Sequence, residues 1–170
     1  DSFNIDSIPT REMAKITTLI TNDSYLVKGT VREHLSVRKN ITEEEMYNAL
    51  EKVNLRDFVE EHGGLDYELA IGAANLSGGQ KQRLLAAKAI LKDSYLYILD
   101  EAVSNIDDYS KEIVLNAFDS IKEGKIIIVI SHDLETVTNA DNIYVLKDKK
   151  IIEEGTHYEL LEEHTLYTQF

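Results

Sequence analysis

Four small or polar residues open a predicted helix, and their types suit the binding of an anion. They are Ser77, Gly78, Gly79 and Gln80, and an apolar stretch of helical composition follows at 84–91. Serine is a common helix cap, and two glycines leave the backbone N–H groups bare. Such amides, together with the positive end of the helix dipole, attract phosphate groups. By themselves, these residues also fit an ordinary capped helix that follows a glycine turn.

Two carboxylates end a predicted strand further along the chain. The run 95–99 is apolar, with aromatic and branched residues typical of a buried parallel strand, and Asp100 and Glu101 follow it. Open α/β sheets bind ligands at the carboxyl ends of their strands. One carboxylate there can hold Mg²⁺, and the next can polarise a water for attack on a phosphoryl group. In isolation, the pair also fits the solvated start of a loop.

A histidine follows a second apolar run, which we predict to be another buried strand, at 126–130. His132 could donate a hydrogen bond to a phosphate oxygen or to a water. A lone histidine is more often structural. Here, however, it stands at the same kind of strand end as Asp100 and Glu101, so we expect the three side chains to serve one site.

Strands and helices alternate in the second half of the chain, and this pattern predicts a parallel sheet. Strands are predicted at 15–20, 95–99 and 126–130, with a hairpin at 142–146 and 150–153. Helices are predicted at 31–35, 42–53, 55–61, 77–91, 109–122, 134–139 and 157–163. Thr42 and Glu45 have the spacing of a capping box, which we prefer to a glycosylation signal as the interpretation of 40–42.

Composition limits the classes of protein that this chain can represent. Its 170 residues are enough for one core, with 43% hydrophobic and 29% charged residues as in ordinary globular domains. A net charge of −13 argues against a nucleic-acid partner, because phosphate backbones require clustered Lys and Arg. The chain has no cysteine, which excludes disulfides and thiolate metal sites.

Five motifs, in order, resemble those of the nucleotide-binding domain of ATP-binding cassette (ABC) transporters. The run 76–80, Leu-Ser-Gly-Gly-Gln, looks like the ABC signature. The resemblance implies that Asp100 is the Walker B aspartate at Mg²⁺ and that Glu101 is the catalytic glutamate. It also implies that His132 is the switch histidine. The D-loop, usually Ser-Ala-Leu-Asp, is represented by Ser104, Asn105, Ile106 and Asp107.

The flanking sequences are similar to those of exporter-type cassettes, at 26–35 and at 145–161. The resemblance covers nearly the whole chain. It implies an α/β fold, with the parallel sheet core of P-loop ATPases, incomplete here, and an inserted α-helical subdomain. We expect residues 1–170 to be the C-terminal part of such a domain. The helical subdomain would span about 30–91, and the core would use 1–29 and 92–170.

Three positions depart from the family pattern. No Walker A sequence, Gly-x-x-x-x-Gly-Lys-Ser/Thr, occurs in the chain, so we expect the C-terminal two-thirds of a cassette. The Q-loop glutamine, which reaches Mg²⁺, aligns with Asn22, or with Thr21 if one residue is inserted. Asparagine is one methylene shorter. Ile71 stands where exporters usually carry a glutamate that meets a coupling helix.

The resemblance implies an ATP-binding and ATP-hydrolysing module that powers export, with ATP and Mg²⁺ as cofactors. Two such domains, identical or different, would meet head to tail, so that Ser77, Gly79 and Gln80 contact ATP held by the partner. The other partner would be a transmembrane domain, at the cytoplasmic face of the cell membrane. Two alternatives remain open. One is a non-hydrolysing regulatory cassette, favoured by Asn22 and Ile71, and the other is a soluble ABC ATPase, disfavoured by the exporter flanks.

We expect the 170-residue chain to bind Mg-ATP weakly or not at all. Its sequence has no phosphate-binding loop, and the aromatic residue that stacks on adenine lies further upstream in the family. Calorimetric titration with Mg-ATP measures this affinity. A dissociation constant in the low micromolar range would contradict the expectation.

Overall fold

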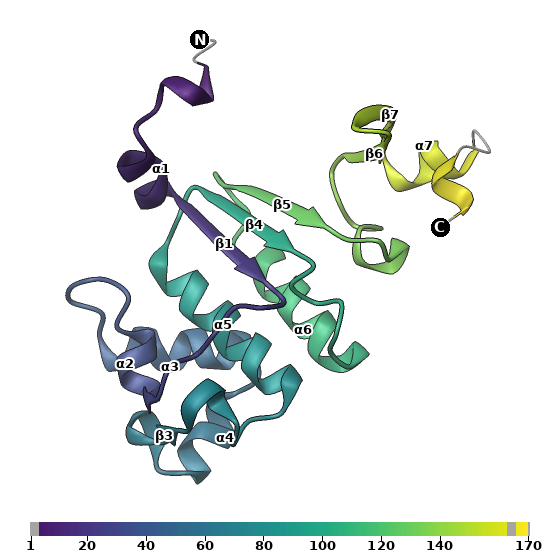
Figure 1. The fold of residues 1–170 in the computed structure, drawn as a ribbon. Helices are drawn as coiled ribbons and strands as arrows, with labels where there is room; N and C mark the ends of the chain where they lie inside the picture. Colours follow the sequence, from purple (N-terminus) through teal and green to yellow (C-terminus); the bar gives the residue numbers. More distant parts are fainter. Residues whose placement is uncertain (1–3, 163–165, 170) are drawn as a thin grey trace. The chain divides into compact units, whose positions relative to one another are not determined.

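The computed structural model describes residues 4–162 and 166–169 (Figure 1). The chain divides into two compact units, Asp1–Ile128 and Val129–Phe170, and each is described by itself. Within the described ranges, none of the helices combines the length and apolar character that a membrane span needs.

A three-stranded sheet forms the α/β part of the structure, in the order β1 (Thr17–Thr21), β4 (Leu96–Asp100), β5 (Ile126–Ile130). β1 and β4 run parallel, with Thr17 opposite Leu96 and Thr21 opposite Asp100. Side chains of the central strand are buried alternately, because Tyr97 and Leu99 point into the core and Tyr97 meets Phe118 edge to face. The predicted parallel α/β core is therefore confirmed.

Two details of the strand prediction are wrong. The first strand begins two residues later than predicted, because α1 (Thr10–Ile16) extends to Ile16. The ammonium group of Lys92 stabilises this arrangement by donating hydrogen bonds to the carbonyls of Ala14 and Thr17, at 3.1 and 2.5 Å. β5 has its predicted bounds but is not buried. It is one of the two edge strands of the described sheet, and Ile126 is 63% exposed.

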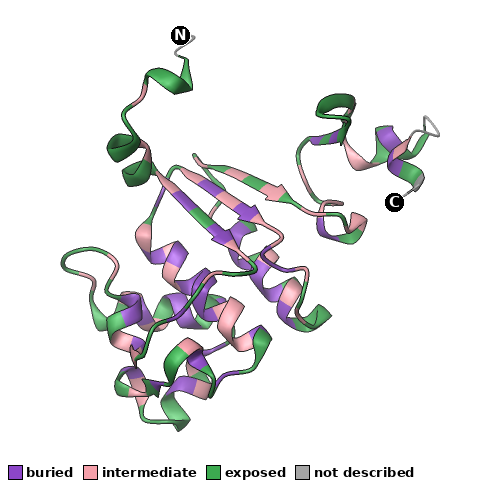
Figure 2. Ribbon diagram, in the orientation of Figure 1, coloured by how far each residue is buried: buried purple, intermediate pink, exposed green. Residues whose placement is uncertain are grey.

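Helices make up most of the region between β1 and β4. They are α2 (Val31–Leu35), α3 (Glu43–Lys52), α4 (Arg56–Glu61) and α5 (Gly78–Lys92). The strands β2 (Gly29–Thr30) and β3 (Glu68–Leu69) form a short antiparallel pair. α6 (Asp108–Asp119) follows β4 and packs beside α5. Figure 2 shows that buried residues gather on α5 and on one side of α6, which places the core between these helices and the sheet.

Among the described residues, four helices begin with a capping box. That of the last helix, His157–Glu162, pairs Thr156 with Glu159. Of the remaining three boxes, one is predicted from the sequence above. The Thr42–Glu45 pair is confirmed, with the Glu45 carboxylate accepting from the Thr42 N–H at 2.7 Å. The other two boxes are Thr30–Glu33 and Ser77–Gln80. Each box satisfies two backbone N–H groups that the helix itself leaves unpaired. The helix starts are therefore fixed locally, before any tertiary packing.

The second unit contains a hairpin and a helix. β6 (Ile143–Lys147) and β7 (Lys150–Gly155) pair antiparallel, with an irregularity at Val145/Leu146, and α7 (His157–Glu162) follows. Ile143, Val145, Leu160 and Tyr167 form its buried cluster. The predicted hairpin is confirmed. The last predicted helix is confirmed to Glu162, whereas its final residue, Glu163, lies outside the described residues. The remaining predicted helix, 134–139, is a short 3-10 turn, Leu134–Thr136.

A buried histidine anchors the segment that leads from β1 to α2. The side chain of His34 is 5% exposed, and its Nε2 lies 3.0 Å from the carbonyl oxygen of Val27. Burial lowers the pKa of the imidazole below its ordinary value. The Val27 carbonyl and Glu33 act in the opposite sense, while the charge of Lys88 adds to the lowering. The folded state therefore holds His34 neutral at a pH where the unfolded chain would protonate it.

This difference predicts a pH dependence of stability. As the pH falls below about 6.5, the unfolded chain takes up the proton first, so the free energy of unfolding decreases until the folded imidazole also protonates. The slope from one such group is at most about 1.4 kcal/mol per pH unit. We expect His34→Gln to flatten this part of the profile in urea unfolding between pH 5 and 7, a range set by the ordinary histidine pKa of about 6.5. Equal slopes for wild type and His34→Gln would refute the assignment.

Candidate functional site

The carboxyl ends of β1 and β4 lie side by side and bring predicted site residues together. Thr21 is directly opposite Asp100 in the parallel register, so Asn22 and Glu101 are the next residues along the two adjacent strands. The Thr21 N–H donates to Ser24 Oγ at 2.9 Å, and this turn leaves Asn22 exposed. The register therefore places an amide next to two acids at one edge of the sheet.

Oxygen ligands at this edge fit Mg²⁺. The ion prefers oxygen and usually takes one or two carboxylates together with substrate phosphates and water. Asp100 offers a carboxylate, and Asn22, directly after the neighbouring strand, offers an amide oxygen. Over the described residues, no group of three or more His, Cys, Asp or Glu side chains is arranged to hold a metal. The protein would therefore supply only part of the coordination, with phosphate oxygens and water as the remaining ligands.

The backbone at Glu101 adopts a left-handed conformation, which the sequence did not predict. Its φ is 51°, a region that residues other than glycine rarely occupy. Ser104 stabilises this turn by donating two hydrogen bonds to the Glu101 carbonyl oxygen. Its N–H donates at 3.2 Å and its hydroxyl at 2.8 Å. The Oε2 atom of Glu101 is buried. Backbone strain of this kind is found at sites where a side chain must be held in one direction.

The first turn of α5 presents open amides. Ser77 caps the helix by accepting from the Gln80 N–H at 3.1 Å, and the Gln80 side chain accepts from the Ser77 N–H at 2.9 Å. Lys81 N–H donates to the Ser77 carbonyl. Between these bonds, Gly78 and Gly79 have no recorded backbone acceptor among residues 4–162 and 166–169. The predicted capped, glycine-containing helix start is confirmed.

Gly79 is buried against the first turn of α6, a contact that the sequence analysis missed. A Cβ atom built on Gly79 would lie 2.6 Å from Asp107 Oδ2 and 2.8 Å from Ser110 Cβ, and it would also overlap Ser110 Oγ. Asp107 caps α6 by accepting from the Ser110 N–H at 2.9 Å. The Ser110 N–H and hydroxyl lower the pKa of the Asp107 carboxyl. A serine three residues after the D-loop aspartate was the available signal for this cap.

His132 lies just after β5 and belongs to the second unit. Its side chain is exposed. The residues on either side of it form a tight turn, with the Asp133 N–H donating to Ser131 Oγ at 3.0 Å and Asp133 capping the next turn through the Glu135 N–H. The loop backbone around the histidine is therefore fixed within its own unit.

The segment around Ile71 differs from the family pattern and presents an apolar side chain. Ile71 is 71% exposed on the 3-10 helix Ile71–Ala73. The ring of Tyr25, which follows Asn22 closely in the chain, lies against Gly72, 3.2 Å from the position of a Cβ atom there. Gly72 has a φ of 64°, so this turn requires glycine for both space and backbone conformation.

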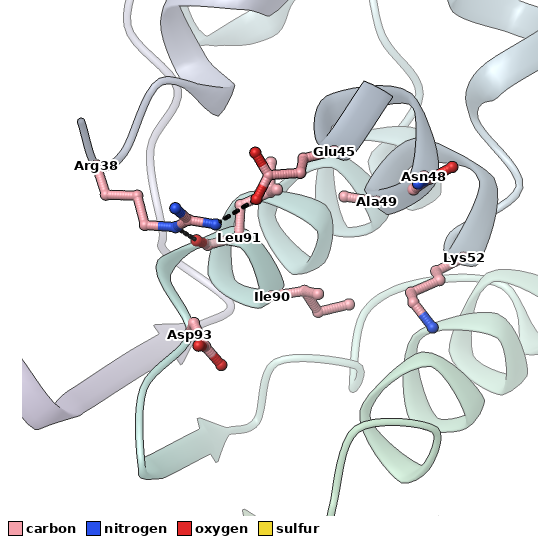
Figure 3. A pocket seen from close by; sticks show the side chains of 8 residues that line it. All are labelled: Arg38, Glu45, Asn48, Ala49, Lys52, Ile90, Leu91 and Asp93. Carbon is pink, nitrogen blue, oxygen red and sulfur yellow. Dashed lines mark hydrogen bonds and ion pairs between the residues drawn. The ribbon is translucent and has the colours of Figure 1, made fainter. Parts of the chain in front are cut away.

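A hollow of about 190 Å³ lies away from these motifs (Figure 3). It is lined by residues of α3, of the C-terminal end of α5 and of the loop before α3. Arg38 crosses it and bonds the Leu91 carbonyl at 3.0 Å and Glu45 at 2.6 Å. The signature turn is at the other end of α5, about 20 Å away for a helix of this length. Because Arg38 already pairs with Glu45 and the hollow lies far from the signature turn, we do not assign it as the phosphate site.

Comparisons with known proteins agree on one family. A family model described as "ABC transporter" matches residues 4–104. The chain is 49% identical to an "Uncharacterized ABC transporter ATP-binding protein" of Haemophilus influenzae over 152 residues, 89% of this chain and 27% of that protein. It is 36% identical to an "ATP-dependent lipid A-core flippase" of Francisella novicida, over 96% of this chain and 29% of the relative. It therefore spans less than a third of the length of these relatives.

A solved structure has the same fold. The chain superposes on a bacterial Atm1-family ABC exporter with ATP bound, with a TM-score of 0.88 and 26% sequence identity. The match covers 97% of this chain and 29% of the exporter chain. A further relative, from Lactococcus lactis, is named "Multidrug resistance ABC transporter ATP-binding and permease protein" and is 34% identical over 98% of this chain and 29% of its own length.

The contact at Gly79 predicts that two adjacent glycines respond differently to the same substitution. Gly79→Ala should lower the free energy of unfolding by about 1–3 kcal/mol, because the methyl group overlaps the cap of α6. Gly78→Ala is the matched control, since a Cβ there meets nothing within 4 Å. We expect it to be neutral or stabilising by up to about 1 kcal/mol. Urea unfolding of both variants measures the difference, and equal stability would contradict the contact.

Proposed function

The chain belongs to the ABC transporter family, and we propose that it is part of the ATP-binding and ATP-hydrolysing module of an ABC exporter. The observation that carries this proposal is the arrangement at the ends of β1 and β4. There Asn22, Asp100 and Glu101 lie at the carboxyl ends of two adjacent strands. The names of the relatives, a lipid A-core flippase and a multidrug resistance transporter, support export as the process.

ATP is the proposed substrate, and each side chain at the strand ends would have a separate role in its hydrolysis. Asp100 and Asn22 would hold Mg²⁺, which, when bound, neutralises charge on the phosphates. Glu101 would orient the attacking water and take its proton, in the position that the Ser104 bonds to its backbone fix. His132 would donate a hydrogen bond to the transferred phosphoryl group. Catalysis of this kind is positioning and charge stabilisation.

The signature would act on a second nucleotide. In a head-to-tail pair of nucleotide-binding domains, Ser77 and the open amides of Gly78 and Gly79 would face the γ-phosphate of ATP bound by the partner domain. Gln80 would keep the first turn of the helix closed through its bond to Ser77. The positive end of the α5 dipole favours the phosphate charge at this position. A second nucleotide-binding domain is therefore the proposed partner.

The helical subdomain, about 30–91, and the core, 1–29 and 92–170, are the proposed parts of the domain, with the phosphate-binding loop elsewhere in a longer protein. We place the module at the cytoplasmic face of the cell membrane, attached to a transmembrane domain. Movement would be transmitted to that domain through the segment around Asn22, where Tyr25 and the exposed Ile71 lie close together. The acidic charge of the chain supports the absence of a nucleic-acid partner.

A regulatory, non-hydrolysing cassette is the second candidate. The shorter Asn22 at the metal edge and Ile71 in place of an acid favour it. The left-handed backbone at Glu101, which Ser104 stabilises, favours hydrolysis, because a cassette without a catalytic base has no need for a rarely occupied backbone conformation at this residue. The two candidates differ in the consequence of removing the Glu101 charge.

Glu101→Gln in the full-length protein should lower the ATP turnover rate by about 10²-fold or more, because the substitution removes the base and keeps the shape. Nucleotide binding should remain. Steady-state hydrolysis and binding of a fluorescent ATP analogue measure the two properties. Glu123→Gln makes the same chemical change at an exposed position and should leave the turnover rate unchanged. Turnover of Glu101→Gln within a few-fold of wild type would favour the regulatory candidate.

A further inference from the structure

We infer that Ser110 and Asp107, at the start of α6, are positioning residues that hold the signature glycine Gly79 in place. This inference rests on the proposed function, because it assigns what sets the geometry of the signature. Ser110 would not touch the nucleotide. It would act through Gly79, and thus through the amides that follow the Ser77 cap.

The contact is between two rigid parts. Ser110 is 2% exposed, and its N–H is bonded to Asp107 at 2.9 Å. The Asp107 carboxylate is the cap of α6 and interacts with both the N–H and the hydroxyl of Ser110. Neither group can swing away without breaking the cap. Gly79 approaches so closely that even one methyl group has no room, which leaves α5 a single position against this surface.

A second contact one turn along fixes the direction of α5. The guanidinium group of Arg83 lies over the ring of Tyr109, 5.6 Å from its centroid, and donates to the Asn54 carbonyl at 2.9 Å. Arg83 is four residues after Gly79 and therefore on the same face of α5. Tyr109 is next to Ser110. Two helices that touch at two successive turns keep their relative position better than helices that touch at one.

The same turn of α6 is linked to the catalytic carboxylate. Ser104 holds the Glu101 carbonyl through two hydrogen bonds, and the D-loop runs directly from Ser104 to Asp107. The segment 101–110 thus connects Glu101, which would act on this chain's own ATP, to Gly79, which would act on the partner's ATP. A shift of the D-loop would move both groups together.

A double-mutant cycle in the 170-residue chain tests the contact without any activity. Gly79→Ala should lower the urea midpoint. Combining it with Ser110→Gly should recover part of that loss, because the Ser110 side-chain atoms that the methyl group overlaps are removed while Asp107 Oδ2 remains. Gly78→Ala with Ser110→Gly is the control, and its effects should add. Additive effects for the 79/110 pair as well would overturn the inference.

A second experiment tests the consequence for hydrolysis in the full-length protein. Ser110→Ala should lower kcat by about tenfold, on the scale of a small misplacement of a reacting group, while the dissociation constant for an ATP analogue changes less than about twofold. If Ser110 had only a structural role, Ser110→Ala would lower the yield of folded protein and the affinity for the ATP analogue together. Ser120→Ala, at the exposed end of the same helix, should leave kcat unchanged. Gly79→Ala should lose kcat, and the added Ser110→Gly should restore part of it.

The outcomes separate this inference from the proposed function. A wild-type protein without ATP hydrolysis would overturn the proposed function, and the stability cycle would then decide the contact alone. Hydrolysis by the wild type with an unchanged kcat for Ser110→Ala would overturn the positioning role. Should Gly79→Ala fail to fold even with Ser110→Gly, the kcat of Ser110→Ala decides the question.

Discussion

The absence of space beside Gly79 is the constraint on which the first unit depends most. Helices usually pack through side chains that can repack at modest cost, but α5 meets the cap of α6 with a bare backbone. The partner surface, Asp107 and Ser110, is itself fixed by the cap hydrogen bond. The contact with α6 therefore requires a glycine in this position. In the proposed function, a phosphate that approaches the α5 amides would require it as well.

The geometry of the sheet edge follows from the same segment. β4 ends at Asp100, the chain turns sharply through the left-handed Glu101, and Ser104 closes that turn. This turn places Asp107 at the start of α6, and Gly79 of α5 packs against that start. A strand end with two acids and a helix start with two glycines are thus parts of one arrangement. In the proposed function, this arrangement allows a single chain to contribute to two nucleotide sites with a fixed distance between its contributions.

Local features of the structure could be predicted from the sequence, because short-range rules determine them. The Thr42 capping box and the bounds of α2 follow from residues a few positions apart. The place of Asp100 and Glu101 at the carboxyl end of a strand also followed from the sequence. Their adjacency to Asn22, by contrast, depends on the pairing of β1 with β4, which the sequence did not predict. Likewise, the start of β1 depends on Lys92, which is distant in sequence. The exposure of the β5 side chains depends on which other elements cover that strand. Neither periodicity nor composition carries that information.

The contact between Gly79 and Ser110 also joins residues that are distant in sequence. Observing this contact is the most direct test of the account. Nuclear magnetic resonance of the 19.3 kDa chain can observe it without substitution. The account predicts an intense nuclear Overhauser cross-peak between the α protons of Gly79 and the β protons of Ser110, and none between Gly78 and any residue of α6. Absence of the Gly79–Ser110 cross-peak, with both residues assigned and α5 and α6 helical, would contradict the account.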